Sequence, residues 1–298
     1  MAGHLCEDET TDTLHAGDVP PVDDGTLEPG PRRLLAAFAL FTALATHQLL
    51  VRGGRTDVHW AWTVQSRPTV AFLGAAYAAG LVLSIAALRQ PSWRHVRVAV
   101  ATVTAFTVLT LAATLVHAHK LHLSAADPLA RSAAWVWVAV YVAVPVAGLA
   151  VLGRQGSGRG LGGHPLPLGL RRVLVAQGLA LGGTGAVLFC RGLTAHHGTA
   201  ATAGCRPWPL TPLSAQVVGA WLVALAVGAA LVVRERDLDA LRVPAVTYTA
   251  FGVFQCAVLL RYVGEMDAGP ALWAYGAVLT AVVATGGYGW WVVRRRAG

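Results

Sequence analysis

Eight long apolar segments alternate with short polar segments along the chain. They cover approximately residues 34–51, 68–88, 98–116, 132–152, 173–190, 213–233, 243–260 and 271–293. Each is close to the roughly 20 residues that an α-helix needs to cross a bilayer. Because the segments are continuously apolar and do not alternate as the strands of a membrane barrel do, they predict helices. We therefore expect an all-α membrane protein with eight transmembrane helices.

One stretch of this pattern occurs twice. Residues 97–106 read RVAVATVTAF and residues 242–251 read RVPAVTYTAF, so Arg, Val, two Thr, Ala and Phe recur at an offset of 145. Shorter matches, at offsets of 139 and 138, join Arg32-Arg33 to Arg171-Arg172 and Trp135-Val-Trp137 to Trp273-Ala-Tyr275. We interpret these matches as a duplication of four helices. Since four is even, the two halves should be parallel repeats related by an axis along the membrane normal.

The spans and the repeat divide the chain into four parts. Residues 1–31 are an acidic tail that we expect to be disordered, residues 32–153 and 171–298 are the two four-helix repeats, and residues 154–170 are a Gly-rich linker. Within the linker, residues 158–163 match the dinucleotide pattern G-x-G-x-x-G. That motif requires a preceding strand, which a membrane helix excludes here, so the linker reads as a flexible connection.

Composition and charge agree with a membrane protein. Hydrophobic residues make up 55% of the chain, charged residues only 13%, and the mean hydropathy is +0.55. Most of the bases lie at the ends of apolar segments, where they meet lipid headgroups, so the lipid bilayer and not nucleic acid is the expected partner. One side of the predicted bundle collects 15 bases and the other 8. The positive-inside rule then predicts a protein of the cytoplasmic membrane with both termini cytoplasmic.

The interiors of the spans hold few groups with obvious chemistry. No Asp, Glu, Lys or Arg falls in the middle third of any span, which disfavours a cation-coupled carrier. Thr102, Thr104, Thr247 and Thr249 are expected to hydrogen-bond the carbonyl one turn back, as hydroxyls in membrane helices commonly do.

Histidine gathers at the predicted outer face. The third span is followed by His117, His119, Lys120 and His122. If the helix continues past the headgroups, His119 and His122 lie on one face at a spacing that can share a metal. The alternative is a cluster wetted by headgroups, and we predict no metal and no other cofactor.

The second repeat carries acids where the first carries bases. At the offset of 145, Lys120 corresponds to Glu265 and His122 to Asp267. The two sets either face each other or form solvated loops that do not meet. If they meet, a carboxylate should keep a histidine protonated to higher pH. The candidate outer polar site comprises His47, His117, His119, Lys120, His122, Arg261, Glu265 and Asp267.

Two cysteines flank the outer loop after the fifth span. Cys190 and Cys205 would lie on the oxidising side of the membrane, so a disulfide between them is possible.

The residues before the second and sixth spans carry a family resemblance. Trp208-Pro-Leu-Thr-Pro-Leu-Ser-Ala stands ahead of Gly219-Ala-Trp221, and Ala-Trp62-Thr63 stands ahead of Phe72-Leu-Gly74-Ala. The pattern resembles a group of uncharacterised actinobacterial multi-pass membrane proteins. The resemblance implies a membrane location and brings no activity.

Three classes of function remain open. The first is binding or permeation of a small or lipid-like molecule, with a site on the axis between the repeats. The second is a membrane-embedded enzyme that acts on a lipid or isoprenoid at the outer face through the His and acid groups. The third is an accessory membrane subunit, for which the absence of buried charge is the main argument.

Overall fold

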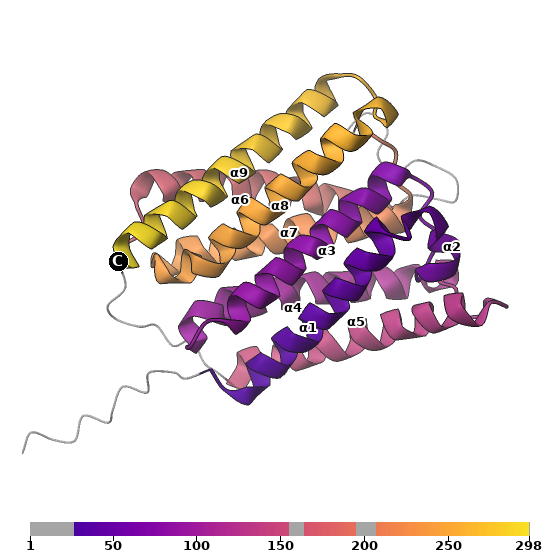
Figure 1. Ribbon diagram of the computed structural model, residues 1–298, viewed down its shortest axis with the longest axis horizontal. Helices are drawn as coiled ribbons and strands as arrows, with labels where there is room; N and C mark the ends of the chain where they lie inside the picture. The colour runs from indigo at the N-terminus through magenta and orange to yellow at the C-terminus, as the bar shows by residue number, and fades with distance from the viewer. Residues whose placement is uncertain (1–26, 155–163, 195–206, 298) are drawn as a thin grey trace, which may run out of the picture.

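The computed structural model describes residues 27–154, 164–194 and 207–297 (Figure 1). The long helices in these ranges are α1 (Pro29–Leu50), α3 (Arg67–Leu88), α4 (Trp93–Val116), α5 (Pro128–Arg154), α6 (Leu168–Thr194), α7 (Pro212–Glu235), α8 (Arg242–Tyr262) and α9 (Pro270–Ala297). Shorter turns between them are α2 (Thr56–His59), η1 (Gly53–Arg55), η2 (Ala118–Lys120), η3 (Asp239–Leu241) and η4 (Val263–Glu265). The predicted tail and the G-x-G-x-x-G match lie largely or wholly outside the described residues.

The eight predicted spans are confirmed as helices, and most extend beyond their apolar segments. The starts of α3 and α7 show why. The side chain of Ser66 accepts a hydrogen bond from the backbone N–H of Thr69, and the side chain of Thr211 accepts one from Ser214. Each cap is followed by a proline in the first turn, where the missing N–H costs nothing. The two capping residues are equivalent at the offset of 145.

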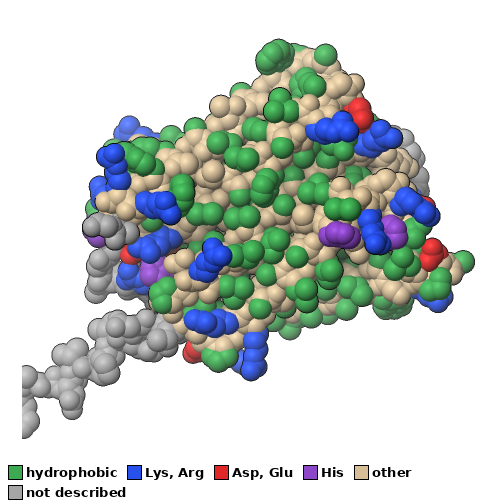
Figure 2. All heavy atoms as spheres, in the orientation of Figure 1, with side chains coloured by type: hydrophobic (Ala, Val, Ile, Leu, Met, Phe, Trp, Pro, Cys, Tyr) green, Lys and Arg blue, Asp and Glu red, His purple; other side chains and the backbone are tan. Residues whose placement is uncertain are grey.

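All eight long helices have the length and hydropathy to cross a bilayer. Figure 2 shows hydrophobic side chains across the middle of one face, with Lys, Arg and His side chains gathered towards its two ends. The chain is therefore a polytopic membrane protein. We call the end at which α1 and α6 begin the arginine-rich end, and the end at which α4 and α8 finish the histidine-bearing end.

The helices form two layers of four (Figure 1). One layer has the order α9, α8, α3, α1 and the other the order α6, α7, α4, α5, with each helix packed against the next. Each half of the chain therefore contributes two helices to each layer. Between 44% and 72% of the apolar windows of α3, α4, α7 and α8 is buried, against 22% to 39% for the other four. The core lies between the four central helices.

Helices that correspond in the predicted repeat pack against neighbours that also correspond. A two-fold axis at the centre would exchange the two layers, because α3 corresponds to α7 and α4 to α8. One close contact also recurs: a Cβ on Gly148 would meet the hydroxyl of Thr104, and a Cβ on Gly286 would meet that of Thr249. Both features support the predicted duplication, which a superposition of the halves would test.

The core of the first half is aromatic. Tyr77 and Tyr141 are fully buried and share a hydrogen bond of 2.7 Å between their hydroxyls. Phe41, Phe106 and Trp137 pack edge-on or tilted against this pair, with ring centroids 4.3–6.1 Å apart. Such ring pairs add packing energy beyond the area that they bury.

The core of the second half depends on glycine. A Cβ on Gly185 of α6 would lie 2.7 Å from the carbonyl oxygen of Gly219 on α7, and a Cβ on Gly219 would lie 2.6 Å from that of Gly185. The two backbones approach too closely for any side chain at these positions. Gly178 and Gly182 extend the contact in a G-x-x-x-G arrangement, which is common at membrane helix interfaces.

Candidate functional site

His117 is the most buried member of the predicted outer polar site. It follows the last residue of α4, and only 8% of its surface is exposed. Its Nδ1 donates to the carbonyl oxygen of Ala113 at 3.3 Å, and its ring stacks with that of His119 at a centroid distance of 6.1 Å. Burial lowers the pKa of His117 below its usual value, and the bond to Ala113 opposes this shift. The direction is opposite to the one expected from a neighbouring carboxylate.

His119 and His122 do not share a helical face. The helix ends at Val116, a turn of 3₁₀-helix follows over Ala118–Lys120, and His122 lies beyond it in an extended connection. The Nδ1 of His122 donates to the carbonyl oxygen of Trp60 at 3.1 Å, so its Nε2, 3.1 Å from Thr63, is free to accept that hydroxyl. The condition for a shared face, that the helix continues past the headgroups, is therefore not met, because the capping residue His117 already leaves helical geometry.

The two acids of the second half have different surroundings. Glu265 lies 3.7 Å from Arg67 in an exposed ion pair, and the backbone N–H of Asp267 donates to Pro207. Arg261 lies over the ring of Tyr262 at 5.4 Å. The remaining predicted members, His47 and Lys120, are exposed. The structure thus gives His122 and Glu265 different neighbours, and pairing of His122 with Asp267 stays a prediction.

The described part of the chain bears on the metal alternative but does not include both cysteines of the predicted disulfide. There, no group of three or more His, Cys, Asp or Glu side chains lies close enough to hold a metal ion. Cys190 is exposed near the end of α6, and Cys205 lies outside the described residues, so the disulfide stays a prediction.

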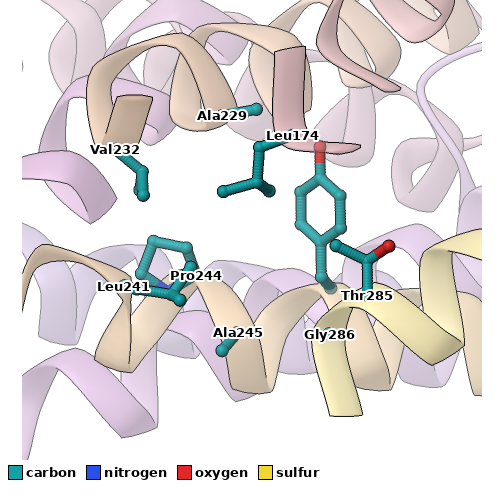
Figure 3. Close-up of a pocket in the computed structure, with 9 residues that line it drawn as sticks. Leu174, Ala229, Val232, Leu241, Pro244, Ala245, Thr285 and Gly286 are labelled. Carbon is teal, nitrogen blue, oxygen red and sulfur yellow. The ribbon is translucent and has the colours of Figure 1, made fainter. Parts of the chain in front are cut away.

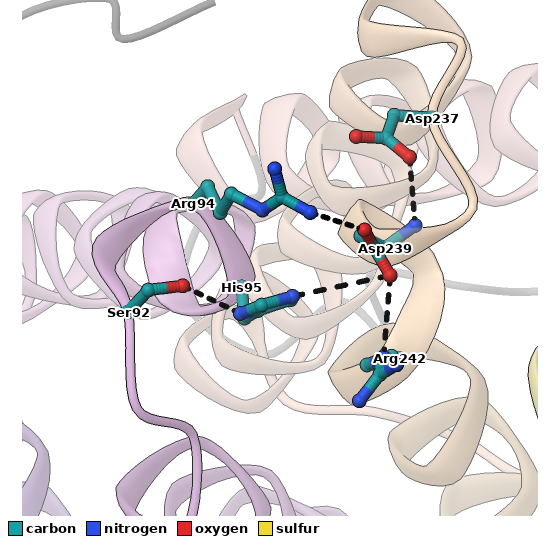
Figure 4. A network of polar contacts seen from close by, with 6 residues as sticks. All are labelled: Ser92, Arg94, His95, Asp237, Asp239 and Arg242. Atoms are coloured by element: carbon teal, nitrogen blue, oxygen red, sulfur yellow. Dashed lines mark hydrogen bonds and ion pairs between the residues drawn. The ribbon is translucent and has the colours of Figure 1, made fainter. Parts of the chain in front are cut away.

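A polar network lies at the arginine-rich end, where the sequence reasoning placed no site (Figure 4). Its local fold explains how the acids are presented. After α7, Arg236 adopts the left-handed conformation with φ of 55°, which turns the chain sharply. The carboxylate of Asp237 then accepts from the backbone N–H of Asp239 at 2.9 Å. Leu238 and Leu241 are buried and anchor the turn, so the side chain of Asp239 is held at the start of η3 and α8.

This network joins the two halves of the chain. Asp239 lies 2.5 Å from Arg94, 3.4 Å from Arg242 and 3.9 Å from His95 (Figure 4). A second ion pair, 2.7 Å long, joins Arg97 of α4 to Glu235 of α7. Arg94 and Asp239 are equivalent at the offset of 145, and so are Arg97 and Arg242. If the halves are related by a two-fold axis, as the repeat predicts, corresponding residues that touch each other lie close to that axis.

The order Ser92, His95 and Asp239 has the residue types of a catalytic triad but not its geometry. The Oγ of Ser92 lies 2.6 Å from Nδ1 of His95, whereas Nε2 is 3.9 Å from the carboxylate, beyond hydrogen-bond distance. That carboxylate also pairs with two arginines. Ser92 precedes the first turn of α4 and holds His95 one turn away, which is a structural arrangement and not a nucleophile with its base.

Two small apolar gaps lie inside the bundle below the network. The central gap lies between α3, α4, α7 and α8. Its walls include three pairs of residues equivalent at the offset of 145, namely Leu83 with Gly228, Ala99 with Pro244, and Thr102 with Thr247. The hydroxyls of Thr102 and Thr247 donate to carbonyls one turn back, as do those of Thr104 and Thr249, so that expectation is confirmed. These bonds leave the walls apolar.

The lateral gap lies within the second half, between α6, α7, α8 and α9 (Figure 3). Leu174, Ala229, Leu241 and Thr285 are among the residues that line it. The two gaps share Pro244 and Tyr248, which therefore stand between them. Each has a volume of about 10 Å³, enough for about one water molecule.

Comparisons of this chain with family models, curated proteins and solved structures found no match. The function must therefore be inferred from the residues of the network and the gaps.

The sequence contains a signal for this network, namely a change of charge between corresponding positions of the repeat. The repeat pairs Lys120 with Glu265, and this change of charge led to the prediction of a polar site at the histidine-bearing end. The same comparison pairs Arg94 with Asp239. Sequence alone does not show which of these pairs lies close to the axis, and the packing of α4 against α7 and η3 settles that point.

Proposed function

We propose that the protein binds the apolar tail of a lipid-like molecule in the central and lateral gaps. The observation that carries the proposal is that two gaps with apolar walls lie on either side of Pro244 and Tyr248 in the membrane-spanning bundle. Sites for small molecules in helix bundles are commonly apolar spaces between helices. A lipid tail is the apolar molecule that the surrounding bilayer supplies in greatest amount.

Binding is better supported than permeation because aromatic rings fill the centre of the bundle beyond the central gap. Phe106 and Trp221 stack with their centroids 3.9 Å apart, and Phe72 packs edge-on against Phe251 at 6.2 Å. A pathway for a polar solute needs hydrogen-bonding groups along its lining. These four rings offer an apolar barrier instead.

A bound tail would require the helices around Tyr248 to separate, since each gap is only about as large as a water molecule. Tyr248 is held in place by a hydrogen bond of 3.3 Å from its hydroxyl to the carbonyl oxygen of Leu225. A single neutral bond of this kind contributes about 0.5–1.5 kcal/mol, so displacing the ring is within reach of tail binding.

The outer-face enzyme is less well supported. His122 is engaged by Trp60 and Thr63, while Glu265 pairs with Arg67. No contact among the described residues specifically supports the role of an accessory subunit.

The test is to fill the gaps and measure retained lipid. Ala99 lines the central gap and Ala245 the lateral gap, and both are buried. Ala99→Leu and Ala245→Leu should each reduce the lipid that remains after detergent exchange, as quantified by mass spectrometry. Ala113→Leu is the matched control, because Ala113 is equally buried on α4 and lines neither gap.

Thermal unfolding of the three variants in detergent separates loss of binding from loss of fold. The proposal requires Ala113→Leu to keep its lipid even where its stability falls as far as that of the gap variants. Equal lipid in the parent and in both gap variants would contradict it.

A further inference from the structure

We infer that Arg94, Arg97 and Arg242 form a binding site for the phosphate of an anionic lipid, a site at which Asp239 and Glu235 act as internal competitors. The inference rests on the proposed function, because it assigns the headgroup of the molecule whose tail occupies the gaps. It begins from two neighbouring groups of ion pairs that join the halves, in which two guanidinium groups converge on Asp239 and a third pairs with Glu235. Asp239 contacts Arg94 and Arg242, and Glu235 contacts Arg97.

The position of the three arginines suits a headgroup. Arg97 is two residues before Ala99, and Arg242 is two residues before Pro244, and both of these neighbours line the central gap. The arginines thus stand about 3 Å along their helices from the gap, on another face of each helix, and a headgroup above a tail in the gap would lie at their level. Basic pockets between membrane helices are known binding places for the phosphates of anionic lipids.

The chemistry of the arginines also suits phosphate. A guanidinium presents several N–H donors in a plane and binds phosphate and carboxylate in the same way, often through two parallel hydrogen bonds. The acids therefore hold the arginines in the arrangement that a phosphate would need. The side chains of Arg94 and Arg242 are 44% and 37% exposed, so a headgroup can reach them without unfolding the turn.

The groups around Asp239 also affect how strongly its carboxylate holds the arginines. Asp239 also has His95 at 3.9 Å, and the carboxylate of Asp237 is engaged by the backbone N–H of Asp239. A phosphate that binds the arginines would release Asp239 and Glu235. The ion pairs that join the two halves would then loosen directly beside the central gap. Binding of the head and opening of the gap are thereby coupled.

The experiment compares lipids that differ only in their head. Native mass spectrometry of the full-length protein in detergent would measure dissociation constants for phosphatidic acid and phosphatidylcholine with identical acyl chains. Phosphatidic acid should bind about tenfold more tightly, because its phosphomonoester carries up to two negative charges, whereas the single phosphate charge of phosphatidylcholine is balanced by its own ammonium group. Inorganic phosphate is the third arm and should bind far more weakly, because it has no tail for the gap.

Two substitutions should act in opposite directions. Arg97→Gln should weaken binding of phosphatidic acid about tenfold through loss of a charge-assisted contact. Asp239→Asn keeps the shape but removes the competing charge, so it should strengthen that binding at least about threefold while lowering the thermal stability of the lipid-free protein. Arg295→Gln is the control, since Arg295 lies over Trp291 at the end of α9 and outside the site. It should change binding less than about twofold.

The outcomes distinguish the two proposals. Equal affinity for the two lipids, or weakening by Asp239→Asn as well as by Arg97→Gln, would overturn the headgroup site and leave tail binding intact. Binding of inorganic phosphate as tight as that of phosphatidic acid would also overturn it, because the source would then be a free anion. Failure of both lipids to bind would contradict the proposed function itself.

Discussion

The two halves of the molecule place different side chains at equivalent positions around their cores. At the offset of 139, Phe38 of α1 corresponds to Gln177 of α6. Phe38 is buried and packs edge-on against Phe106 at 6.4 Å. Gln177 instead donates to Thr285, a residue of the lateral gap, at 2.8 Å. The first half is filled by rings where the second half keeps a hydrogen bond beside a gap.

This difference indicates where a helix bundle has room for a site. Rings that interlock, such as Tyr77 with Tyr141 and Phe106, leave no room for another molecule and hold their helices in one arrangement. Helices that meet through glycine and alanine leave small spaces and have fewer interlocking side chains. On this account, the aromatic core of the first half is the rigid support, the central gap lies between the halves, and the lateral gap belongs to the second half alone.

The largest effect is expected from removing a ring of the first half. Phe38→Ala should lower the free energy of unfolding by about 3–5 kcal/mol, because it deletes a fully packed aromatic side chain. Gln177→Ala at the equivalent position should cost about 1 kcal/mol, the contribution of one hydrogen bond. Reversible unfolding in mixed micelles would measure both. Equal losses would remove the distinction between the two cores.

A smaller effect is expected at the glycine contact of the second half. Gly185→Val should cost about 1–3 kcal/mol, because its Cβ would meet the backbone of α7 and force the helices apart. Gly183→Val on the same helix is the control, since a Cβ there meets nothing within 4 Å. If the two variants unfold alike, helix propensity and not close packing determines the result.

The spans and their approximate limits could be predicted because apolar runs in a bilayer leave the backbone only one arrangement. Helix ends that lie in water were harder to predict from the sequence. The third apolar segment ends at residue 116, as α4 does, but the sequence left open whether a helix continues through His119 and His122, and it does not. The network at Asp239 was missed because it depends on a contact between residues 145 positions apart. Periodicity within one helix cannot reveal such a contact.

The smallest predicted effect concerns pH at the histidine-bearing end. Burial lowers the pKa of His117 in the folded protein, so below about pH 6.5 the unfolded chain takes up a proton more readily than the folded one. Stability should therefore fall as the pH is lowered from about 7 to 5, by less than about 1.4 kcal/mol per pH unit from this residue. His117→Gln should flatten the slope, measured by thermal unfolding across this range, with exposed His47→Gln as the control for losing a histidine. An unchanged slope in His117→Gln would show that other groups cause it.

The most direct test of lipid binding between the helices is a cross-linking map. Phosphatidic acid with a photoactivatable diazirine midway along one acyl chain would be bound to the full-length protein, irradiated and located by peptide mass spectrometry. We predict cross-links within residues 225–228 of α7 and 243–248 of α8, two segments that contain most of the gap-lining residues of these helices, and their loss in Ala99→Leu. Cross-links confined to lipid-facing residues such as Leu179 and Leu260, which are 73% and 79% exposed, would contradict the account.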